Sequence, residues 1–243
     1  MNLVIDVGNT RIKLAVFSNN NLVEKQVVKL SCFLAEVIQL KERYNTIDTA
    51  ILSNVSFLDP DTMARLKAYL KVIQLSAKTH LPFINKYKTP NTLGVDRLAL
   101  VSAAVKFKPN VNSLIIDAGT CITYDFINNK NEYLGGAISP GVSVRYKSLN
   151  NLTSNLPLLP VEVPLGIIGT STNQAIHSGI VYGVLNEIDG VIATYRTKYS
   201  DLTVILTGGD ANFLSKQLKS TIFANSNFLL EGLNYILQFN KNQ

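Results

Sequence analysis

The stretch that decides the fold occurs twice in this chain. Residues 3–8 read Leu-Val-Ile-Asp-Val-Gly, and residues 114–119 read Leu-Ile-Ile-Asp-Ala-Gly. In each copy an apolar run with the composition of a buried strand ends at an aspartate, and a glycine follows two residues later. Because an internal repeat indicates a duplicated architecture, we expect two similar structural units.

The first copy opens a run of three short strands, and helices and strands then alternate. The strands are predicted at 3–7, 11–17 and 22–28, and a helix is predicted to start at Ser31. The rest of this half is predicted as a strand at 49–53, a helix capped by Asp59 with Pro60 at its first position, a strand at 71–76 and a helix over 95–107.

The same order begins again after Pro109. Three strands are predicted at 113–119, 122–127 and 132–139, and a short helix is predicted after Gly141. The rest is predicted as an inserted loop at 152–169, a long helix over 172–199, a strand at 202–207, a helix at 211–218, a strand at 221–224 and a last helix through 234–239.

This order predicts an α/β fold of two ribonuclease-H-like domains, each with a mixed sheet in the order βββαβαβα. We expect an N-terminal domain over residues 1–110 and a C-terminal domain over residues 111–243. Because ligands often bind between domains, the cleft between them is the expected site.

The composition excludes several other classes of protein. The chain has 243 residues, 47% of them hydrophobic, which rules out global disorder. No apolar run reaches the ~18–20 residues of a membrane span, and the N-terminus has no basic leader. The two cysteines, Cys32 and Cys121, have no metal-site spacing, so a cytoplasmic location is expected. The net charge of +6 is compatible with a nucleic acid or a small anionic substrate as ligand. Because the Lys and Arg residues are scattered, nucleic-acid binding is disfavoured.

Two loops are candidates for phosphate binding. The first comprises Asp6, Val7, Gly8, Asn9, Thr10, Arg11, Ile12 and Lys13. Its backbone N–H groups and hydroxyl suit a phosphate, its aspartate suits a cation or its waters, and Lys13 adds a point charge. A plain β-hairpin would use the same residues, and one copy alone favours that interpretation. The second copy, from Asp117 to Thr120, reverses the preference. A third glycine turn, Thr207 to Asp210, suits either a nucleotide or an ordinary tight turn.

A further candidate lies at the start of the helix over 95–107. In the segment Gly94-Val95-Asp96-Arg97, the aspartate is either a partner of the helix dipole or a base that accepts a proton from an attacking hydroxyl. The arginine can pair with a substrate carboxylate.

Taken together, these motifs resemble type III pantothenate kinase. The resemblance rests on DVGNTRIK at 6–13, GVDR at 94–97, DAGT at 117–120 and YLGGAISPG at 133–141. It implies an actin-like ATPase fold and the phosphorylation of pantothenate by ATP with Mg²⁺, the first step of coenzyme A biosynthesis. It also implies a homodimer that needs K⁺ or NH₄⁺ and builds its substrate pocket at the dimer interface.

The resemblance also assigns roles to single residues. Asp6 to Lys13 and Thr120 would bind ATP, and Asp96 would be the base. Pantothenate would contact Tyr87 and the segment from Gly94 through Val95 and Asp96 to Arg97. Asp117 would bind the monovalent cation. A threonine from the partner subunit would also contact pantothenate, and this is assigned to Thr172, with Thr170 left open.

Two other functions stay open at this point. One is a kinase of another small acceptor on the same fold, against which the carboxylate-seeking Arg97 argues. The other is a regulatory protein that binds ATP or associates with DNA. The residues expected of an active kinase are present at all the named catalytic positions, which a regulator would not need. Salt-dependent DNA binding without phosphoryl transfer would favour the regulator.

Overall fold

The computed structural model describes residues 1–8, 11–54 and 58–241. By its contacts the chain forms two compact units. Unit 1 comprises Met1–Pro109, Asn131–Tyr133 and Asn227–Gln243, and unit 2 comprises Asn110–Lys130 and Leu134–Ser226. The domain division at residues 110 and 111 follows the repeated order of elements rather than contacts, and it stays a prediction.

Unit 1 is built on a five-stranded sheet with the strand order β3-β2-β1-β4-β5. Its elements are β1 (Asn2–Val7), β2 (Ile12–Ser18), β3 (Asn21–Val28), η1 (Leu30–Cys32), α1 (Phe33–Arg43), β4 (Thr49–Asn54), α2 (Pro60–Tyr69), β5 (Lys71–Gln74), β6 (Ile84–Asn85), η2 (Pro90–Thr92), α3 (Val95–Phe107) and α7 (Phe228–Lys241). The central strand β1 runs antiparallel to β2 and parallel to β4.

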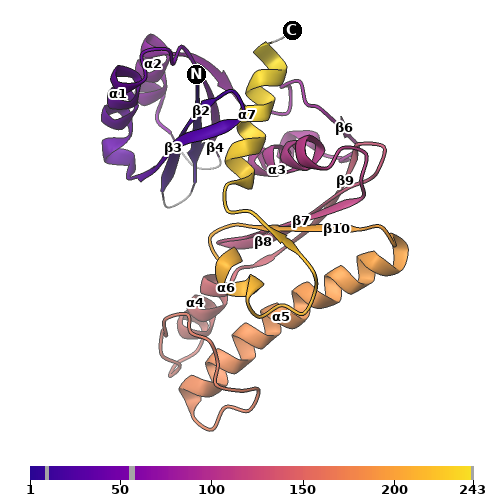
Figure 1. The fold of residues 1–243 in the computed structure, drawn as a ribbon. Coiled ribbons are helices and arrows are strands. Elements are labelled where there is room, and N and C mark those ends of the chain that lie inside the picture. The colour runs from indigo at the N-terminus through magenta and orange to yellow at the C-terminus, as the bar shows by residue number, and fades with distance from the viewer. Residues whose placement is uncertain (9–10, 55–57, 242–243) are drawn as a thin grey trace. The chain divides into compact units, whose positions relative to one another are not determined.

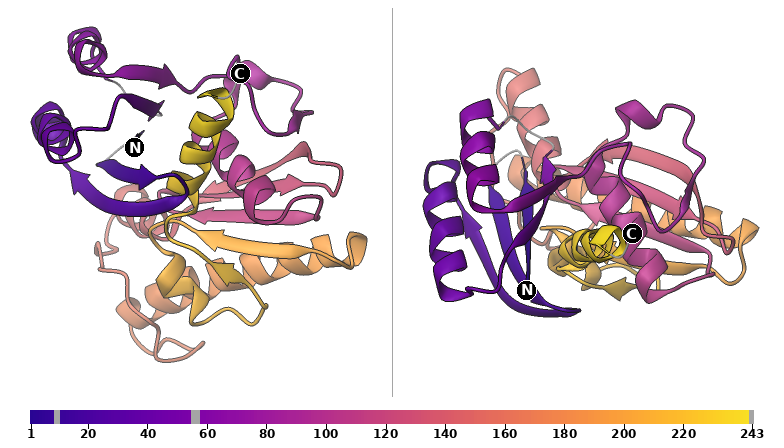
Figure 2. Two further views of the ribbon diagram at one scale, coloured as in Figure 1. Left: turned by 45° about the horizontal axis from the view of Figure 1, so that its top comes forward. Right: turned by 90° about the horizontal axis from the view of Figure 1, so that it is seen from above.

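The two faces of β1 pack against different helices. Leu3, Ile5 and Val7 belong to the core shared with α1 and α2, whereas Val4 belongs to the core shared with α3 and α7 (Figure 2). Each buried Leu or Ile side chain contributes about 2 kcal/mol relative to an exposed one. Because side chains alternate along a strand, Asp6 points to the same face as Val4, toward α3.

Unit 2 contains strands in the order β11-β10-β7-β8-β9. Its elements are β7 (Ser113–Ala118), β8 (Cys121–Ile127), the greater part of β9 (Glu132–Pro140), α4 (Val142–Leu152), α5 (Thr172–Lys198), β10 (Thr203–Thr207), α6 (Ala211–Ser215) and β11 (Phe223–Ala224). The long helix α5 runs along the face of β7, β8 and β10 (Figure 1), and its buried side chains form one core with Leu114, Ile116 and Leu206.

The predicted α/β fold with two mixed sheets is confirmed. Unit 1 follows the order βββαβαβα, and the second half inserts α4 before the long helix. The predicted loop at 152–169 has no helix or strand beyond the end of α4. Two strands at sheet edges, β5 and β11, are shorter than predicted. In the part of the chain that the structure describes, no helix is long and apolar enough to cross a membrane. The cleft between the two domains stays a prediction.

Candidate active site

The first acidic loop of unit 1 begins at a buried carboxylate. Asp6 is only 5% exposed, and Lys13, which lies opposite it on β2, places its Nζ 3.3 Å from the Asp6 Oδ2. Ser53 lies beside Asp6 on the parallel strand β4. The strand register therefore surrounds this carboxylate with one cation and one hydroxyl.

A second carboxylate, Asp96, acts on Asp6 from the first turn of α3. The pKa of Asp6 is raised, chiefly because the group is buried and further because of the negative charge of Asp96, while Lys13 and Ser53 oppose the rise. Asp96 is partly exposed, and its Oδ1 accepts a hydrogen bond from the Arg97 N–H at 2.8 Å. A side chain at Gly94 would lie 2.5 Å from this oxygen. Unit 1 therefore brings the predicted phosphate loop and the predicted base together.

Arg97 and Tyr87 form a second group in unit 1. The Arg97 side chain is buried, and its guanidinium carbon lies 5.6 Å from the centre of the Tyr87 ring. The Tyr87 ring in turn stacks on Tyr133, with centres 6.0 Å apart and an angle of 13° between the ring planes. Sequence reasoning missed Tyr133 as a site residue, because its contact with Tyr87 depends on how β6 pairs with β9.

The rest of the first loop lies partly outside the described residues. Asn9 and Thr10 are among the residues that the structure does not describe. The Gly8 N–H donates to the Arg11 carbonyl at 3.1 Å, which closes a hairpin. Val7 and Ile12 have buried side chains in the core with α1 and α2, so only their backbone is left to contact a ligand.

In unit 2 the second acidic loop is enclosed by glycines. A side chain at Gly141 would lie 2.7 Å from the Thr120 carbonyl oxygen, and the Gly141 N–H donates to that oxygen at 2.9 Å. Gly208, at φ +99°, approaches the loop so closely that a side chain there would lie 2.5 Å from the Asp117 Oδ1. Thr120 itself is exposed. Close backbone packing therefore explains why glycine occupies position 141, at the end of YLGGAISPG, and position 208, in the third glycine turn.

The strand register gives Asp117 two hydroxyl neighbours. Thr123 lies opposite it on the antiparallel strand β8, and Thr207 lies beside it on the parallel strand β10. Among the residues that the structure describes, the buried Thr123 hydroxyl has no hydrogen-bond partner. Sequence reasoning did not single out Thr123, because its pairing with Asp117 depends on the length of the turn between the two strands.

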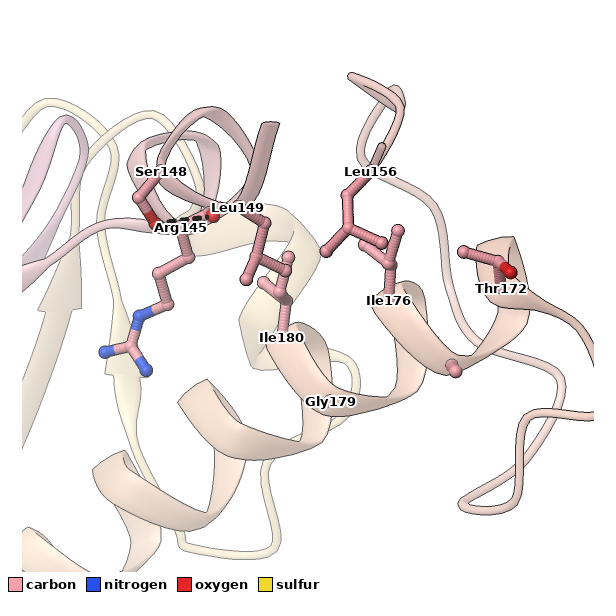
Figure 3. Close-up of a pocket in the computed structure, with 9 residues that line it drawn as sticks. Arg145, Ser148, Leu149, Leu156, Thr172, Ile176, Gly179 and Ile180 are labelled. Carbon is pink, nitrogen blue, oxygen red and sulfur yellow. Dashed lines mark hydrogen bonds between the residues drawn. The ribbon is translucent and has the colours of Figure 1, made fainter. Parts of the chain in front are cut away.

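Thr172 lies in a different part of unit 2, at the start of α5. It lines a hollow of about 620 Å³ together with Leu149, Leu156 and Ile176 (Figure 3). The nearby Thr170 uses its hydroxyl to donate to the Gln174 side chain at 2.7 Å. Both threonines are exposed, and of the two only Thr172 lines this hollow.

Comparisons with known proteins agree with these motifs. The family model described as type III pantothenate kinase matches residues 2–194. A type III pantothenate kinase from Christiangramia forsetii is 54% identical over the full length of both chains.

Two solved structures share the fold at low identity. A Campylobacter jejuni protein that carries the name of a Baf family transcriptional activator is 22% identical, with a TM-score of 0.67 over 99% of this chain and all of that one. A ROK hexokinase from Thermus thermophilus is 14% identical, with a TM-score of 0.50 over 98% of this chain and 99% of that one. These likenesses show the fold alone.

The family match covers most of the chain, and the relative matches all of it. The chain therefore belongs to the type III pantothenate kinase family and is an ATP-dependent kinase that phosphorylates pantothenate in coenzyme A biosynthesis.

Proposed function

We propose that Asp96 is the catalytic base of this kinase and that the loop from Asp6 to Lys13 holds the phosphates of ATP. The observation that supports this proposal is that Asp96 lies near enough to Asp6 for its negative charge to contribute to the raised pKa of Asp6. In a phosphoryl-transfer site, the carboxylate that orients the attacking hydroxyl must lie beside the groups that hold the phosphates. The direction in which Asp6 points and the position of Asp96 in the first turn of α3 support such an arrangement within unit 1.

In the proposed reaction Asp96 orients and deprotonates the primary hydroxyl of pantothenate. The hydroxyl oxygen forms a bond to the γ-phosphorus, the bond from that phosphorus to the β–γ bridging oxygen breaks, and ADP leaves. The hydroxyl proton passes to the Asp96 carboxylate. Lys13 lies on the same face as Asp6 and supplies positive charge to the phosphates.

The buried carboxylate of Asp6 fits a divalent metal ion, because hard cations prefer oxygen ligands. When bound with ATP, Mg²⁺ neutralises charge on the β- and γ-phosphates. We assign Thr120 as the second phosphate contact, since it is exposed at the end of a loop that Gly141 and Gly208 hold in place.

Arg97 and Tyr87 are proposed to hold the acceptor. Arg97 is a residue only 5% exposed, and its guanidinium is suited to bidentate pairing with a substrate carboxylate. Gly94 and Val95 bring this arginine to the same end of α3 as Asp96. The segment would therefore place the hydroxyl near the base and the carboxylate near the cation.

Asp117 is proposed to bind the monovalent cation. The residues around it fit such an ion, because Thr123 offers a buried hydroxyl oxygen with no hydrogen-bond partner among the described residues. Where Asp6 is faced by the ammonium of Lys13, Asp117 is faced by a neutral oxygen. K⁺ or NH₄⁺ would supply at Asp117 the positive charge that Lys13 supplies at Asp6.

A homodimer and a cytoplasmic location belong to the same proposal. The segment between α4 and α5 exposes large apolar side chains, among them Leu165 at 92% and Ile168 at 81%. Such a patch is typical of an interaction surface, and a partner subunit seated there would lie close to Thr172. Cys32 and Cys121 are both free and exposed, which suits a reducing compartment.

The proposal is tested with a coupled assay for ADP release and with sedimentation of the purified protein. We expect release to require pantothenate, to be far faster in K⁺ than in Na⁺ and to be lost in Asp96→Asn, and we expect a dimer. Near-normal turnover of Asp96→Asn would overturn the assigned base, and equal rates in K⁺ and Na⁺ would overturn the cation site.

A further inference from the structure

We infer that Tyr133 is a positioning residue for the acceptor site. Its ring stacks on the ring of Tyr87, and the Arg97 guanidinium lies over the same Tyr87 ring. The inference rests on the proposed contact of Tyr87 and Arg97 with pantothenate. It gives a role to Tyr133, the first residue of the YLGGAISPG motif, which has no assigned role so far.

The segment that carries Tyr87 has little regular structure of its own. Between β5 and α3, the chain forms only the two-residue strand β6 and the short turn η2. Such a segment needs tertiary contacts to fix a side chain, because an irregular backbone has few internal hydrogen bonds. The position of Tyr87 must therefore be set by what packs against it.

The start of β9 supplies the backbone part of that support. The Ile84 N–H donates to the Asn131 carbonyl at 2.9 Å, and the Lys86 N–H donates to the Tyr133 carbonyl at 2.9 Å. These bonds hold the chain on the N-terminal side of Tyr87. The Asn85 side chain then accepts from the Tyr87 N–H at 3.0 Å, which turns the chain at this point.

The rings supply the second part of the support. Tyr133 is completely buried, and Phe83 meets its ring edge-on with centres 6.0 Å apart. Its face is stacked on Tyr87 with centres 6.0 Å apart. Because Phe83 and the surrounding core hold Tyr133 in one orientation, Tyr133 gives the Tyr87 ring a fixed surface to lie on. The Arg97 guanidinium, which lies 5.6 Å from the centre of the Tyr87 ring, is positioned through that ring.

This arrangement predicts an effect on substrate binding with little effect on chemistry. Loss of the Tyr133 ring frees Tyr87 and lets the guanidinium move, and the substrate carboxylate then meets a less ordered partner. An aromatic pair of this kind corresponds to about a 3- to 10-fold change in affinity. Because Tyr133 acts through Tyr87 and Arg97 rather than through Asp96 or the phosphate loop, kcat and the KM for ATP should stay within about twofold of wild type.

The test compares Tyr133→Leu, which removes the ring, with Tyr133→Phe, which keeps it. Tyr133→Leu should raise the KM for pantothenate by about 3- to 10-fold, and Tyr133→Phe should be close to wild type. The matched control is Phe107→Leu, which removes a ring stacked on Phe228 in the same unit and should leave the KM unchanged. If Tyr133→Phe is as impaired as Tyr133→Leu, or if Tyr133→Leu lowers kcat with no change in KM, the inference is wrong.

A binding measurement separates this inference from the proposed function. Calorimetric titration gives affinities for pantothenate and for its primary-alcohol analogue, which lacks the carboxylate. Both Arg97→Gln and Tyr133→Leu should lose affinity for pantothenate and much less for the analogue. The quantity compared is the affinity for pantothenate divided by the affinity for the analogue. If this ratio in Arg97→Gln equals that of wild type, the acceptor assignment itself is wrong. If the ratio is lowered in Arg97→Gln but equals that of wild type in Tyr133→Leu, only the role of Tyr133 is wrong.

Discussion

The two acidic loops occupy equivalent places in their sheets and differ in what surrounds the carboxylate. Asp6 and Asp117 each end a central strand, with an antiparallel neighbour on one side and a parallel neighbour on the other. For Asp6 the antiparallel neighbour is Lys13, and for Asp117 it is Thr123. The duplication has thus kept the acid and its place in the sheet while one loop carries its own cation and the other offers a hydroxyl.

The two loops also differ in how their backbone is held. The first closes on itself through the hydrogen bond from Gly8 to Arg11. The second is held from outside by Gly141 and Gly208. The backbone conformation of the first loop therefore depends on residues within the loop. That of the second loop depends on residues far away in the sequence, so substitutions there should disturb it.

The largest expected effect comes from the carboxylate that faces the first loop. Asp96→Asn should lower kcat by about 10²- to 10⁴-fold, because the amide cannot accept the hydroxyl proton. ATP affinity, measured by calorimetry, should stay close to wild type. The companion variant Asp117→Asn should instead weaken the response to K⁺. If the two variants have the same profile, the two loops do not have the different roles proposed here.

The next effect tests the outside support of the second loop. Gly141→Ala places a methyl group against the backbone of Gly119 and Thr120, so the loop must shift. A displacement of about 1 Å near a reacting group costs on the order of 10²-fold in kcat/KM, and steady-state kinetics with varied ATP would measure it. Gly183→Ala is the matched control, because the space around Gly183 is open. Normal kinetics for Gly141→Ala would show that the loop does not depend on this contact.

A smaller effect tests whether Thr123 occupies, beside Asp117, the position that Lys13 occupies beside Asp6. Thr123→Val removes the hydroxyl at nearly constant shape and should raise the K⁺ concentration for half-maximal stabilisation by about fivefold. Thr123→Lys should bring a tethered ammonium to Asp117, so that its melting temperature and turnover no longer respond to K⁺. Melting curves in KCl and NaCl measure the response. A Thr123→Lys protein that folds and still requires K⁺ would contradict the comparison.

The smallest expected effect concerns stability. Burial raises the pKa of Asp6, so the fold favours the protonated form and loses stability as the pH rises through that pKa. Asp6→Asn stays neutral and should melt a few degrees above wild type near pH 7, without ATP or Mg²⁺. The difference should shrink as the pH falls toward the ordinary pKa of an aspartate, because protonation of wild-type Asp6 removes the cost of burying its charge. A variant that melts below wild type at neutral pH would show that the Lys13 pair outweighs the cost of burial.

Much of the fold could be predicted from local patterns. Continuous short apolar runs identify β1 and β7, and Asp59 followed by Pro60 marks the start of α2. The alternation of side chains also places Asp6 on one face of its strand. The short edge strands β5 and β11 were predicted too long, because their ends depend on pairing with a neighbour rather than on their own composition.

By itself, the sequence determined the order of helices and strands along the chain, the repeated acid and the glycine positions, because each follows from short-range periodicity and turn chemistry. Only the tertiary structure decided which residues meet across long separations. The pairing of β6 with β9 joins Tyr133 to Tyr87, and the first turn of α3 brings Asp96 to Asp6. Such contacts depend on strand register and helix packing, which no local stretch of residues encodes.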